Sequence, residues 1–253
     1  MNKIFDLSGK ITLITGASGD IGTSITKAFI DSDSKVYGFD INPSNKKLIS
    51  DRFTYIECDL LDNNTFKSHC NDIYENESRI DVLVNNAGIT IPTNSEKNYT
   101  FEDWENTLRI NLTAPFFCSQ IIKDYMKKNN VGSIINITSI SAELGFPNNP
   151  AYGASKGGLK ALSKSLAYDW ARFGIRVNCI GPGYIGEGMT KKSYSDKIIR
   201  KHRESMMMIK KWNTSNEIAN ACIFLASNAS EYITGQDFYV DGGWTSKGFP
   251  DID

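Results

Sequence analysis

Short apolar runs alternate with longer amphipathic segments along the whole chain. The apolar runs are rich in valine and isoleucine and are bounded by turn-forming residues; they span 10–15, 34–40, 52–59, 79–85, 132–139, 174–181 and 235–241. In the segments between them, such as 21–33, 64–76 and 157–174, apolar residues recur at helical spacing. Alternating strands and helices predict βαβ units and a parallel sheet covered by helices on both faces. The pattern therefore predicts one doubly wound α/β domain over residues 1–253, with a parallel seven-stranded sheet.

Two segments interrupt this alternation. Residues 89–100 are polar and loop-like, and residues 184–213, termed the insert below, add helical sequence before the last strand. Ligands of open α/β sheets bind beyond the carboxyl ends of the strands, where such segments lie. We expect the insert to form a helical lid over a substrate.

The composition bounds the possible partners. The 253 residues carry a net charge of −1, without the basic excess typical of nucleic-acid or anionic-membrane binding. No stretch approaches the ~18 apolar residues of a membrane span, and the N-terminus has no apolar signal core. The five cysteines are widely spread without a C-x-x-C pair, which fits buried side chains in a reducing compartment. We expect a cytoplasmic protein with no nucleic-acid or membrane partner.

A glycine-rich turn follows the first predicted strand and opens the first predicted helix. Its glycines, Gly16, Gly19 and Gly22, would let the backbone approach phosphate oxygens at a helix N-terminus. The second strand ends in Asp40, 18 positions after Gly22, where a carboxylate can accept hydrogen bonds from ribose hydroxyls and repel a 2′-phosphate. No arginine stands beside it, and the nearest lysines, at 46 and 47, are several residues on. The pattern favours NAD over NADP.

Asp20 places a carboxylate inside this turn. We interpret it as a residue of the first helical turn, where the helix dipole favours a negative charge and the side chain can cap N–H groups. The alternative is that Asp20 weakens cofactor binding. In either case it adds repulsion toward an extra phosphate.

Tyr152, Lys156 and Ser139 form a candidate catalytic group. Tyr152 and Lys156 lie four positions apart, so they share a face of one helix, and Ser139 lies 13 positions upstream of Tyr152, just past a strand. Hydride transfer at a carbinol carbon needs a group that takes or gives the hydroxyl proton. A free phenol, with a pKa of about 10, is a poor base near neutrality, and we expect the Lys156 ammonium to lower the pKa of Tyr152. Ser139 can hold the substrate oxygen. The alternative is a surface pair and a helix-capping serine.

Other chemistries have less support. The only histidines, His69 and His202, lie in unremarkable helical segments, and no H-E-x-x-H motif or cysteine cluster offers metal ligands. We expect no metal.

These motifs together resemble the short-chain dehydrogenase/reductase family. The resemblance rests on Gly16-x-x-x-Asp20-x-Gly22, "NNAG" at 85–88, and Ser139 with "YGASK" at 152–156, and it continues through 232–244. It implies a Rossmann-type fold, an oxidoreductase of alcohol or ketone groups, and a homotetramer or homodimer. Asp20 replaces the middle glycine of the family's motif.

The resemblance also implies which residues serve the reaction. Asn111 would help to hold a proton-relaying water, and Lys156 would also bind the nicotinamide ribose. In the "NCIGPGYIG" stretch Glu187 stands where the family often has a cofactor-binding threonine; either Thr190 takes that role or the contact is absent. The implied cofactor contacts are Gly16, Ser18, Gly19, Asp20, Ile21 and Gly22 in the turn, Asp59 and Leu60 at the adenine, Asn86, Ala87 and Gly88 at the riboses, and Pro182, Gly183 and Ile185 at the nicotinamide, together with Tyr152 and Lys156.

The insert bears on the substrate. Between Met189 and Trp212 eight cations outnumber two carboxylates, which suggests an anionic sugar substrate; the alternative is a solvated amphipathic helix. We expect "MMMI" (206–209) to be the buried face of this segment. The region 151–178 resembles dehydrogenases of sugar acids and polyols, and also 3-oxoacyl-carrier-protein reductases. We expect an NAD-dependent dehydrogenase of a sugar, sugar acid, sugar phosphate or polyol. A non-catalytic NAD-binding module or a structural partner is less consistent with the catalytic group.

Overall fold

The strands form one parallel sheet in the order that the alternation predicts. The computed structural model describes residues 3–42, 50–93 and 98–249, and within these residues a seven-stranded sheet has the order β3-β2-β1-β4-β5-β6-β7. All six pairings are parallel. The strands are β1 Ile11–Thr15, β2 Lys35–Asp40, β3 Phe53–Glu57, β4 Val82–Asn85, β5 Gly132–Ile137, β6 Ile175–Pro182 and β7 Asp237–Val240. Each falls within or overlaps one predicted run, so the predicted fold class is confirmed.

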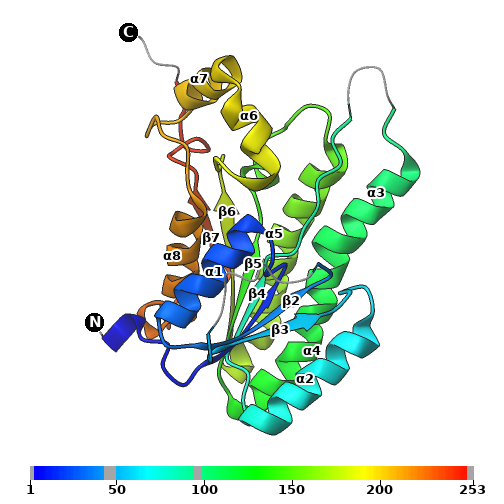
Figure 1. The fold of residues 1–253 in the computed structure, drawn as a ribbon, viewed down its shortest axis with the longest axis vertical. Helices are drawn as coiled ribbons and strands as arrows, with labels where there is room; N and C mark the ends of the chain where they lie inside the picture. Colours follow the sequence, from blue (N-terminus) through cyan, green and yellow to red (C-terminus); the bar gives the residue numbers. More distant parts are fainter. Residues whose placement is uncertain (1–2, 43–49, 94–97, 250–253) are drawn as a thin grey trace.

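Helices cover both faces of the sheet (Figure 1). On one face, α1 and α8 pack against each other and on a core that includes Ile14, Phe29 and Leu225. On the other face, α2, α4 and α5 pack on a core that includes Phe66 and Trp170. The helices are α1 Asp20–Asp31, α2 Asn63–Glu77, α3 Phe101–Leu108, α4 Ala114–Asn129, α5 Pro150–Trp170, α6 Lys191–Ser195, α7 Lys197–Met206 and α8 Ser215–Ala226.

Burial on both faces explains the apolar composition of the central strands. Every residue of β1, β4 and β5 is buried and none is charged, whereas the edge strands β3 and β7 are partly exposed and each carries one carboxylate, Glu57 and Asp237. The strand order reverses between β1 and β4, so the loops that follow these two strands separate and leave a crevice at their carboxyl ends. The glycine turn follows β1, and "NNAG" ends β4, so both motifs lie at this crevice.

The insert stands above the carboxyl edge of the sheet, where Figure 1 shows α6 and α7 at the top of the molecule. Our expectation for residues 206–209 is wrong. Only Met207 is buried, at 1% exposure, whereas Met208 and Ile209 are 54% and 68% exposed. The reason is that α7 ends at Met206, Met207 is extended and residues 208–209 form a bend, so the run does not keep one helical face toward the protein.

All five cysteines are buried and unpaired, as expected. Burial raises the pKa of Cys58 to about 11, so this thiol stays protonated and unreactive at neutral pH. Among the helices of the described residues, none combines the length and apolarity needed to cross a membrane.

Candidate active site

A cavity of about 1380 Å³ lies beyond the carboxyl ends of the strands. It extends from Asp40 at the end of β2, past the glycine turn after β1 and Asn86 after β4, to Ser139 after β5 and Pro182 at the end of β6. Every site residue that the sequence predicted lines this cavity except Asn111. The fold therefore gathers residues that are up to 169 positions apart along the chain (Gly16 to Ile185).

Two of the three glycines in the turn are required by close backbone contacts. Gly16 has a φ of +66°, and a Cβ there would lie 2.7 Å from the Cα of Ala87. A Cβ on Gly22 would lie 2.0 Å from the carbonyl oxygen of Gly16. Gly19 differs, because its φ is −71° and the nearest atom to an added Cβ is 3.6 Å away. The turn thus depends on Gly16 and Gly22, and it leaves the backbone at the start of α1 accessible from the cavity.

Asp20 is the first residue of α1, which confirms its predicted place in the first helical turn. The helix N-terminus has no side-chain cap, so Asp20 acts there only through its charge. Its exposed carboxylate lies beside the insert: a Cβ placed on Gly188 would be 3.1 Å from Asp20 Oδ2. This negative charge therefore stands between the glycine turn and the insert.

Asp40 is held rigidly at the end of β2. Its Oδ2 accepts a hydrogen bond from the Ser18 N–H and its Oδ1 accepts one from the Asn42 N–H, both at 2.9 Å. The Tyr55 hydroxyl donates to the carbonyls of Asp40 and Asn42, which fixes the chain just after β2. The sequence pattern did not identify Tyr55. It is a tyrosine of β3 that lies opposite Gly38 of β2, and this pairing becomes visible only in the folded sheet. Lys46 and Lys47 lie outside the described residues.

Asp59 and Leu60 line the cavity next to Asp40, beyond β3. The Asp59 Oδ1 accepts from the Leu61 N–H at 2.9 Å, which orders this short turn. Their predicted contact with an adenine ring stays a prediction.

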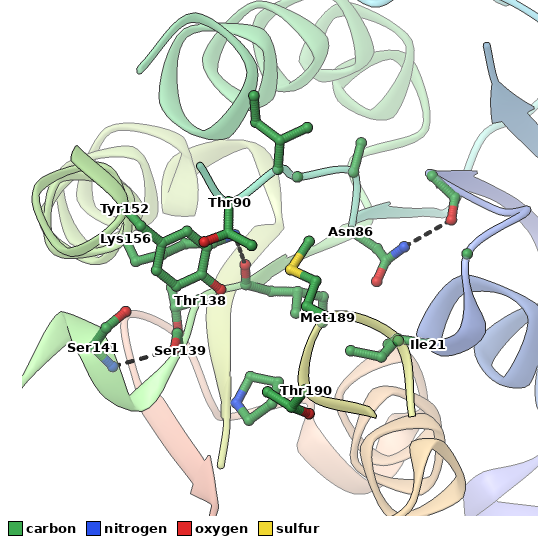
Figure 2. Close-up of a pocket in the computed structure, with 18 of the residues that line it drawn as sticks. Ile21, Asn86, Thr90, Thr138, Ser139, Ser141, Tyr152, Lys156, Met189 and Thr190 are labelled. Atoms are coloured by element: carbon green, nitrogen blue, oxygen red, sulfur yellow. Dashed lines mark hydrogen bonds between the residues drawn. The ribbon is translucent and has the colours of Figure 1, made fainter. Parts of the chain in front are cut away.

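Asn86 ties the end of β4 to the glycine turn. Its side-chain Nδ2 donates to the carbonyls of Thr15 and Gly16 at 3.1 and 3.0 Å, as Figure 2 shows in part. The Thr15 hydroxyl in turn accepts from the N–H groups of Asn86 and Ala87. Asn86 does line the cavity, but its amide nitrogen is committed to the turn. Thr15 is a further residue that the sequence did not single out.

Tyr152 and Lys156 project from one face of α5, as their spacing predicts. The Lys156 Nζ lies 5.8 Å from the centre of the Tyr152 ring and donates to the carbonyl of Ile137 at the end of β5, at 2.7 Å. Lys156 is only 4% exposed, and burial lowers its pKa to about 8. Figure 2 shows these two residues with Ser139 on one side of the cavity and Asn86 on the other.

The pKa of Tyr152 is raised, so the expected lowering is wrong for this structure. Burial is the larger effect, because it disfavours the phenolate, and the hydrogen bond with the Ser139 hydroxyl offsets it only in part. Ser139 also accepts from the Ser141 N–H at 3.2 Å, which orients its side chain. The serine and the tyrosine therefore already form a pair that one substrate oxygen could join.

Asn111 is hydrogen-bonded to the helix that carries Tyr152 and Lys156. It lies in a π-helical segment, Arg109–Thr113, between α3 and α4, and is fully buried. Its amide exchanges two hydrogen bonds with the Ile89 backbone, at 2.8 and 2.9 Å, and donates to the Ser155 hydroxyl at 3.2 Å. Asn111 thus joins the loop after β4 to α5. Its predicted role in holding a water stays a prediction.

The side chains of Glu187 and Thr190 both bind the protein itself. Glu187 accepts from the Ser215 hydroxyl at the start of α8, at 2.7 Å. The Thr190 hydroxyl donates to the carbonyls of Ile185 and Glu187. These bonds join the first residues of the insert to the start of α8 and to one another. They do not distinguish Glu187 from Thr190 as a contact of the cofactor.

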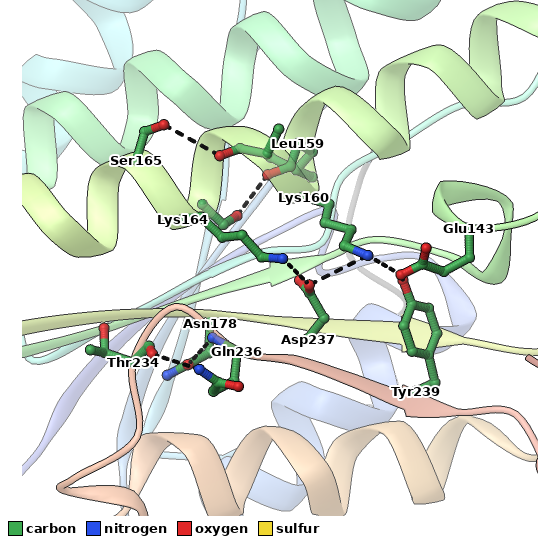
Figure 3. Close-up of polar contacts among 12 residues, drawn as sticks. Glu143, Leu159, Lys160, Lys164, Ser165, Asn178, Thr234, Gln236, Asp237 and Tyr239 are labelled. Atoms are coloured by element: carbon green, nitrogen blue, oxygen red, sulfur yellow. Dashed lines mark hydrogen bonds and ion pairs between the residues drawn. The ribbon is translucent and has the colours of Figure 1, made fainter. Parts of the chain in front are cut away.

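A charged network fixes the turn that carries Ser139 (Figure 3). Glu143 pairs with Lys160 of α5 and accepts from the Tyr239 hydroxyl of β7 at 3.0 Å. Asp237, also on β7, lies 3.6 Å from Lys160 and 3.2 Å from Lys164. The network connects the Ser139 turn with the helix that bears Tyr152 and Lys156. Sequence reasoning did not detect it, because its members are spread over almost 100 positions.

Aromatic rings gather at the part of the cavity that follows β6. The Tyr184 ring lies 5.0 Å from that of Trp244 and 6.3 Å from that of Phe146, measured between ring centres. Phe146 and Tyr184 line the cavity, and Met189 of the insert projects into its centre in Figure 2. These residues were not predicted, because single aromatic residues in loops carry no periodic signal.

Comparisons with known proteins find relatives that match almost the whole chain. A family model described as enoyl-(acyl carrier protein) reductase matches residues 16–245. A 2-dehydro-3-deoxy-D-gluconate 5-dehydrogenase of Bacillus subtilis is 34% identical over 253 residues, covering 98% of this chain and 99% of the relative. A 3-oxoacyl-(acyl-carrier-protein) reductase of Rickettsia conorii is 38% identical over 250 residues, covering 95% and 98%. A gluconate 5-dehydrogenase of Burkholderia cenocepacia, crystallised with NADP and tartrate, has a TM-score of 0.88 at 28% identity, covering 97% of this chain and 98% of that one.

Proposed function

The chain belongs to the short-chain dehydrogenase/reductase family, and on this premise we propose that it is an NAD-dependent dehydrogenase of a sugar, sugar acid, sugar phosphate or polyol. The family makes it an oxidoreductase that acts on alcohol or ketone groups with NAD(P). The substrate class and the choice of NAD are the proposal.

One observation carries the proposal: a single cavity has a dinucleotide cradle on one side and a proton-transfer group on the other. The cradle fits a dinucleotide because Gly16 and Gly22 leave no room for a Cβ, and because Asp40 presents a fixed carboxylate where a ribose would lie. The proton-transfer group is Ser139, Tyr152 and Lys156, which follow β5 and lie across the switch point from Asp40. The two halves thus face the same space.

The chain's own residues would then move one proton and hold the substrate. A bound nicotinamide supplies the hydride acceptor or donor. Tyr152 takes the hydroxyl proton during oxidation and returns it to the carbonyl oxygen during reduction, and Ser139 holds that oxygen by a hydrogen bond. The Lys156 ammonium is held by the Ile137 carbonyl, and its charge would favour the phenolate form of Tyr152 against the burial that raises the pKa of this tyrosine. Asn111 keeps α5 in place against the loop after β4.

The preference for NAD is supported by two carboxylates near the glycine turn. Asp40 has both oxygens turned to backbone donors at the cavity wall, so it cannot easily move away from a 2′-phosphate. Asp20 adds a second negative charge at the start of α1. The Burkholderia relative was crystallised with NADP, so the preference proposed here depends on this chain's own residues.

A 3-oxoacyl-(acyl-carrier-protein) reductase is the second candidate. It is favoured by the Rickettsia relative and by the exposed cations of the insert, such as Lys197 and Lys201, which could meet an acidic carrier protein. Such reductases usually use NADP, and the Asp40 carboxylate disfavours the 2′-phosphate of NADP, so Asp40 argues against this candidate.

The first test is NADH formation by the purified protein with NAD⁺ and matched substrate pairs. Each pair sets a neutral sugar or polyol beside its acid or phosphate, with NADP⁺ in parallel and a 3-oxoacyl thioester tested for NADH oxidation. We expect turnover with NAD⁺ and at least one sugar-derived substrate. The Tyr152→Phe variant should bind NADH normally and lose turnover by at least ~100-fold. Equal turnover by Tyr152→Phe and the native protein would remove Tyr152 from the reaction, and activity confined to the thioester would favour the second candidate.

We further propose that residues 1–253 act as one domain, with the insert as lid, in a cytoplasmic homotetramer or homodimer. The assembly is supported by exposed apolar side chains on α4 and α5, among them Phe117 and Tyr168. The five unpaired cysteines fit a reducing compartment. Sedimentation velocity checks the assembly, and a single monomeric species would contradict it.

A further inference from the structure

One cation of the insert differs from the other seven. Within the described chain, Arg203 of α7 lines the cavity, whereas Lys191, Lys192, Lys197, Arg200, Lys201, Lys210 and Lys211 are exposed and lie outside its lining. The positive charge of the insert as a whole is therefore mostly solvated. Arg203 is thus the cation of the insert that an anionic substrate in the cavity would meet.

Aromatic rings lie against the Arg203 guanidinium. Its central carbon lies 3.9 Å from the centre of the Tyr184 ring and 5.8 Å from that of the Trp212 ring. Tyr184 itself lines the cavity and contacts Phe146 and Trp244. Contacts of this kind restrict the movement of the guanidinium before any ligand binds.

One nitrogen of this guanidinium has no partner. Arg203 Nη1 is buried and makes no hydrogen bond to any of the described residues. A buried charged donor without an acceptor is costly, because it has lost water and gained nothing in exchange. An acceptor is therefore expected at this atom.

Four carboxylates of the insert and the cavity lining already have partners of their own. Asp196 caps the start of α7 by accepting from two backbone N–H groups, and Glu204 binds Arg200 at 3.0 Å. Glu187 accepts from Ser215, and Glu143 pairs with Lys160. Arg203 lines the cavity, and none of the described residues supplies an acceptor to its Nη1. The missing acceptor is thus best supplied by a bound molecule.

We propose that Arg203 binds an oxyanion of the substrate, a carboxylate or a phosphate, and so makes the enzyme specific for acidic sugars. The inference rests on the proposed function and deepens it. A guanidinium recognises both groups through paired N–H donors, so the shared chemistry is a negatively charged group with at least two oxygens. Tyr184 follows β6 and Ser139 follows the neighbouring strand β5. Arg203 and the catalytic group line the same cavity, so a substrate bound there has access to both.

The test measures equilibrium binding to the full-length protein saturated with NADH. D-gluconate, D-glucose 6-phosphate and sorbitol are titrated calorimetrically into the native protein and into Arg203→Gln, Arg203→Lys and Lys201→Gln. We expect at least one of the two anions to bind more tightly than sorbitol and to lose about 10- to 100-fold in affinity in Arg203→Gln. The anion that loses affinity identifies the carboxylate or the phosphate as the recognised group. Arg203→Lys should keep part of the preference.

Lys201→Gln is the matched control, because it removes one charge from the same helix at an exposed position outside the cavity lining. It should change no affinity. NADH affinity and the thermal midpoint, measured for each variant, report an intact fold. Equal affinities of the native protein for all three compounds, no binding of either anion, or equal losses for sorbitol and the anions in Arg203→Gln would overturn the inference.

The two proposals fail separately. NAD-linked turnover of neutral sugars without an anion preference would reject the role of Arg203 and leave the dehydrogenase proposal intact. Anion binding that depends on Arg203, in a protein with no NAD-linked turnover, would support Arg203 as the anion site and reject the proposed function.

Discussion

Replacing Asp40 by asparagine should weaken the discrimination against NADP(H). The substitution keeps the size of the side chain and removes its charge. In the native protein both carboxylate oxygens accept backbone hydrogen bonds at 2.9 Å, from Ser18 and Asn42, so the negative charge stays in place. An asparagine side chain keeps only one accepting oxygen, so one of these two bonds is lost.

The magnitude follows from the charge and its exposure. Two unit charges about 4 Å apart in an effective dielectric of about 20 repel by about 4 kcal/mol. Asp40 is half-buried, so water and salt screen part of this repulsion. We therefore expect the Asp40 charge to weaken the binding of a ribose 2′-phosphate by about 2 kcal/mol, or roughly 30-fold in affinity. The loss of a charged acceptor for the ribose hydroxyls should weaken NADH by about 5-fold. The preference for NADH over NADPH should therefore fall by roughly 100-fold.

Fluorescence titration with NADH and NADPH measures this without any knowledge of the substrate. Asp59→Asn is the matched control: it also removes one carboxylate from the cavity lining, and it should weaken both nucleotides by the same small factor. An unchanged ratio of the two affinities in Asp40→Asn would refute the argument that this charge selects the nucleotide. A similar change of ratio in Asp59→Asn would show that net charge, and not position, is responsible.

Three further predictions concern the catalytic pair, the turn and the support of β2. Burial raises the pKa of Tyr152, and substrate oxidation needs the phenolate form of this residue. The kcat/KM of oxidation should therefore rise by about tenfold per pH unit between pH 7 and 8, whereas the kcat/KM of ketone reduction should not. pH profiles of kcat/KM in both directions test this. The Lys156 pKa of about 8 should make the rise less steep above that pH, as its charge is lost, and a flat oxidation profile would contradict both assignments. Gly22→Ala should lower the free energy of unfolding by about 3 kcal/mol, because its Cβ meets a backbone oxygen, whereas Gly19→Ala should cost about 1 kcal/mol or less; urea unfolding compares the two. Tyr55→Phe removes the hydroxyl that anchors the end of β2 and should weaken NADH binding by about 5-fold without changing the catalytic pH profile, and normal binding would show that the anchor is dispensable.

The fold and the central site residues follow from short-range patterns. The alternation of short apolar runs with helical segments located all seven strands. The signal is strongest for the central strands, because a strand buried on both faces is apolar at most positions. The glycine turn and the Tyr152–Lys156 pair were also visible, because their spacing fixes their geometry within one turn or one helix. Parallel pairing then brings the carboxyl ends of the strands to one edge of the sheet, so these motifs must meet there.

The tertiary structure alone decided which side chains are free to act. Eight cations in the insert look alike in the sequence, and only the placement of α7 over the cavity selects Arg203 among them. Asn111 is used for support because a π-helical turn aims its amide at the Ile89 backbone, and the end of α7 at Met206 leaves Met208 exposed. The physical reason is common to these cases. Spacing specifies neighbours within one element, whereas burial and hydrogen-bond partners depend on elements that meet only after the chain has folded.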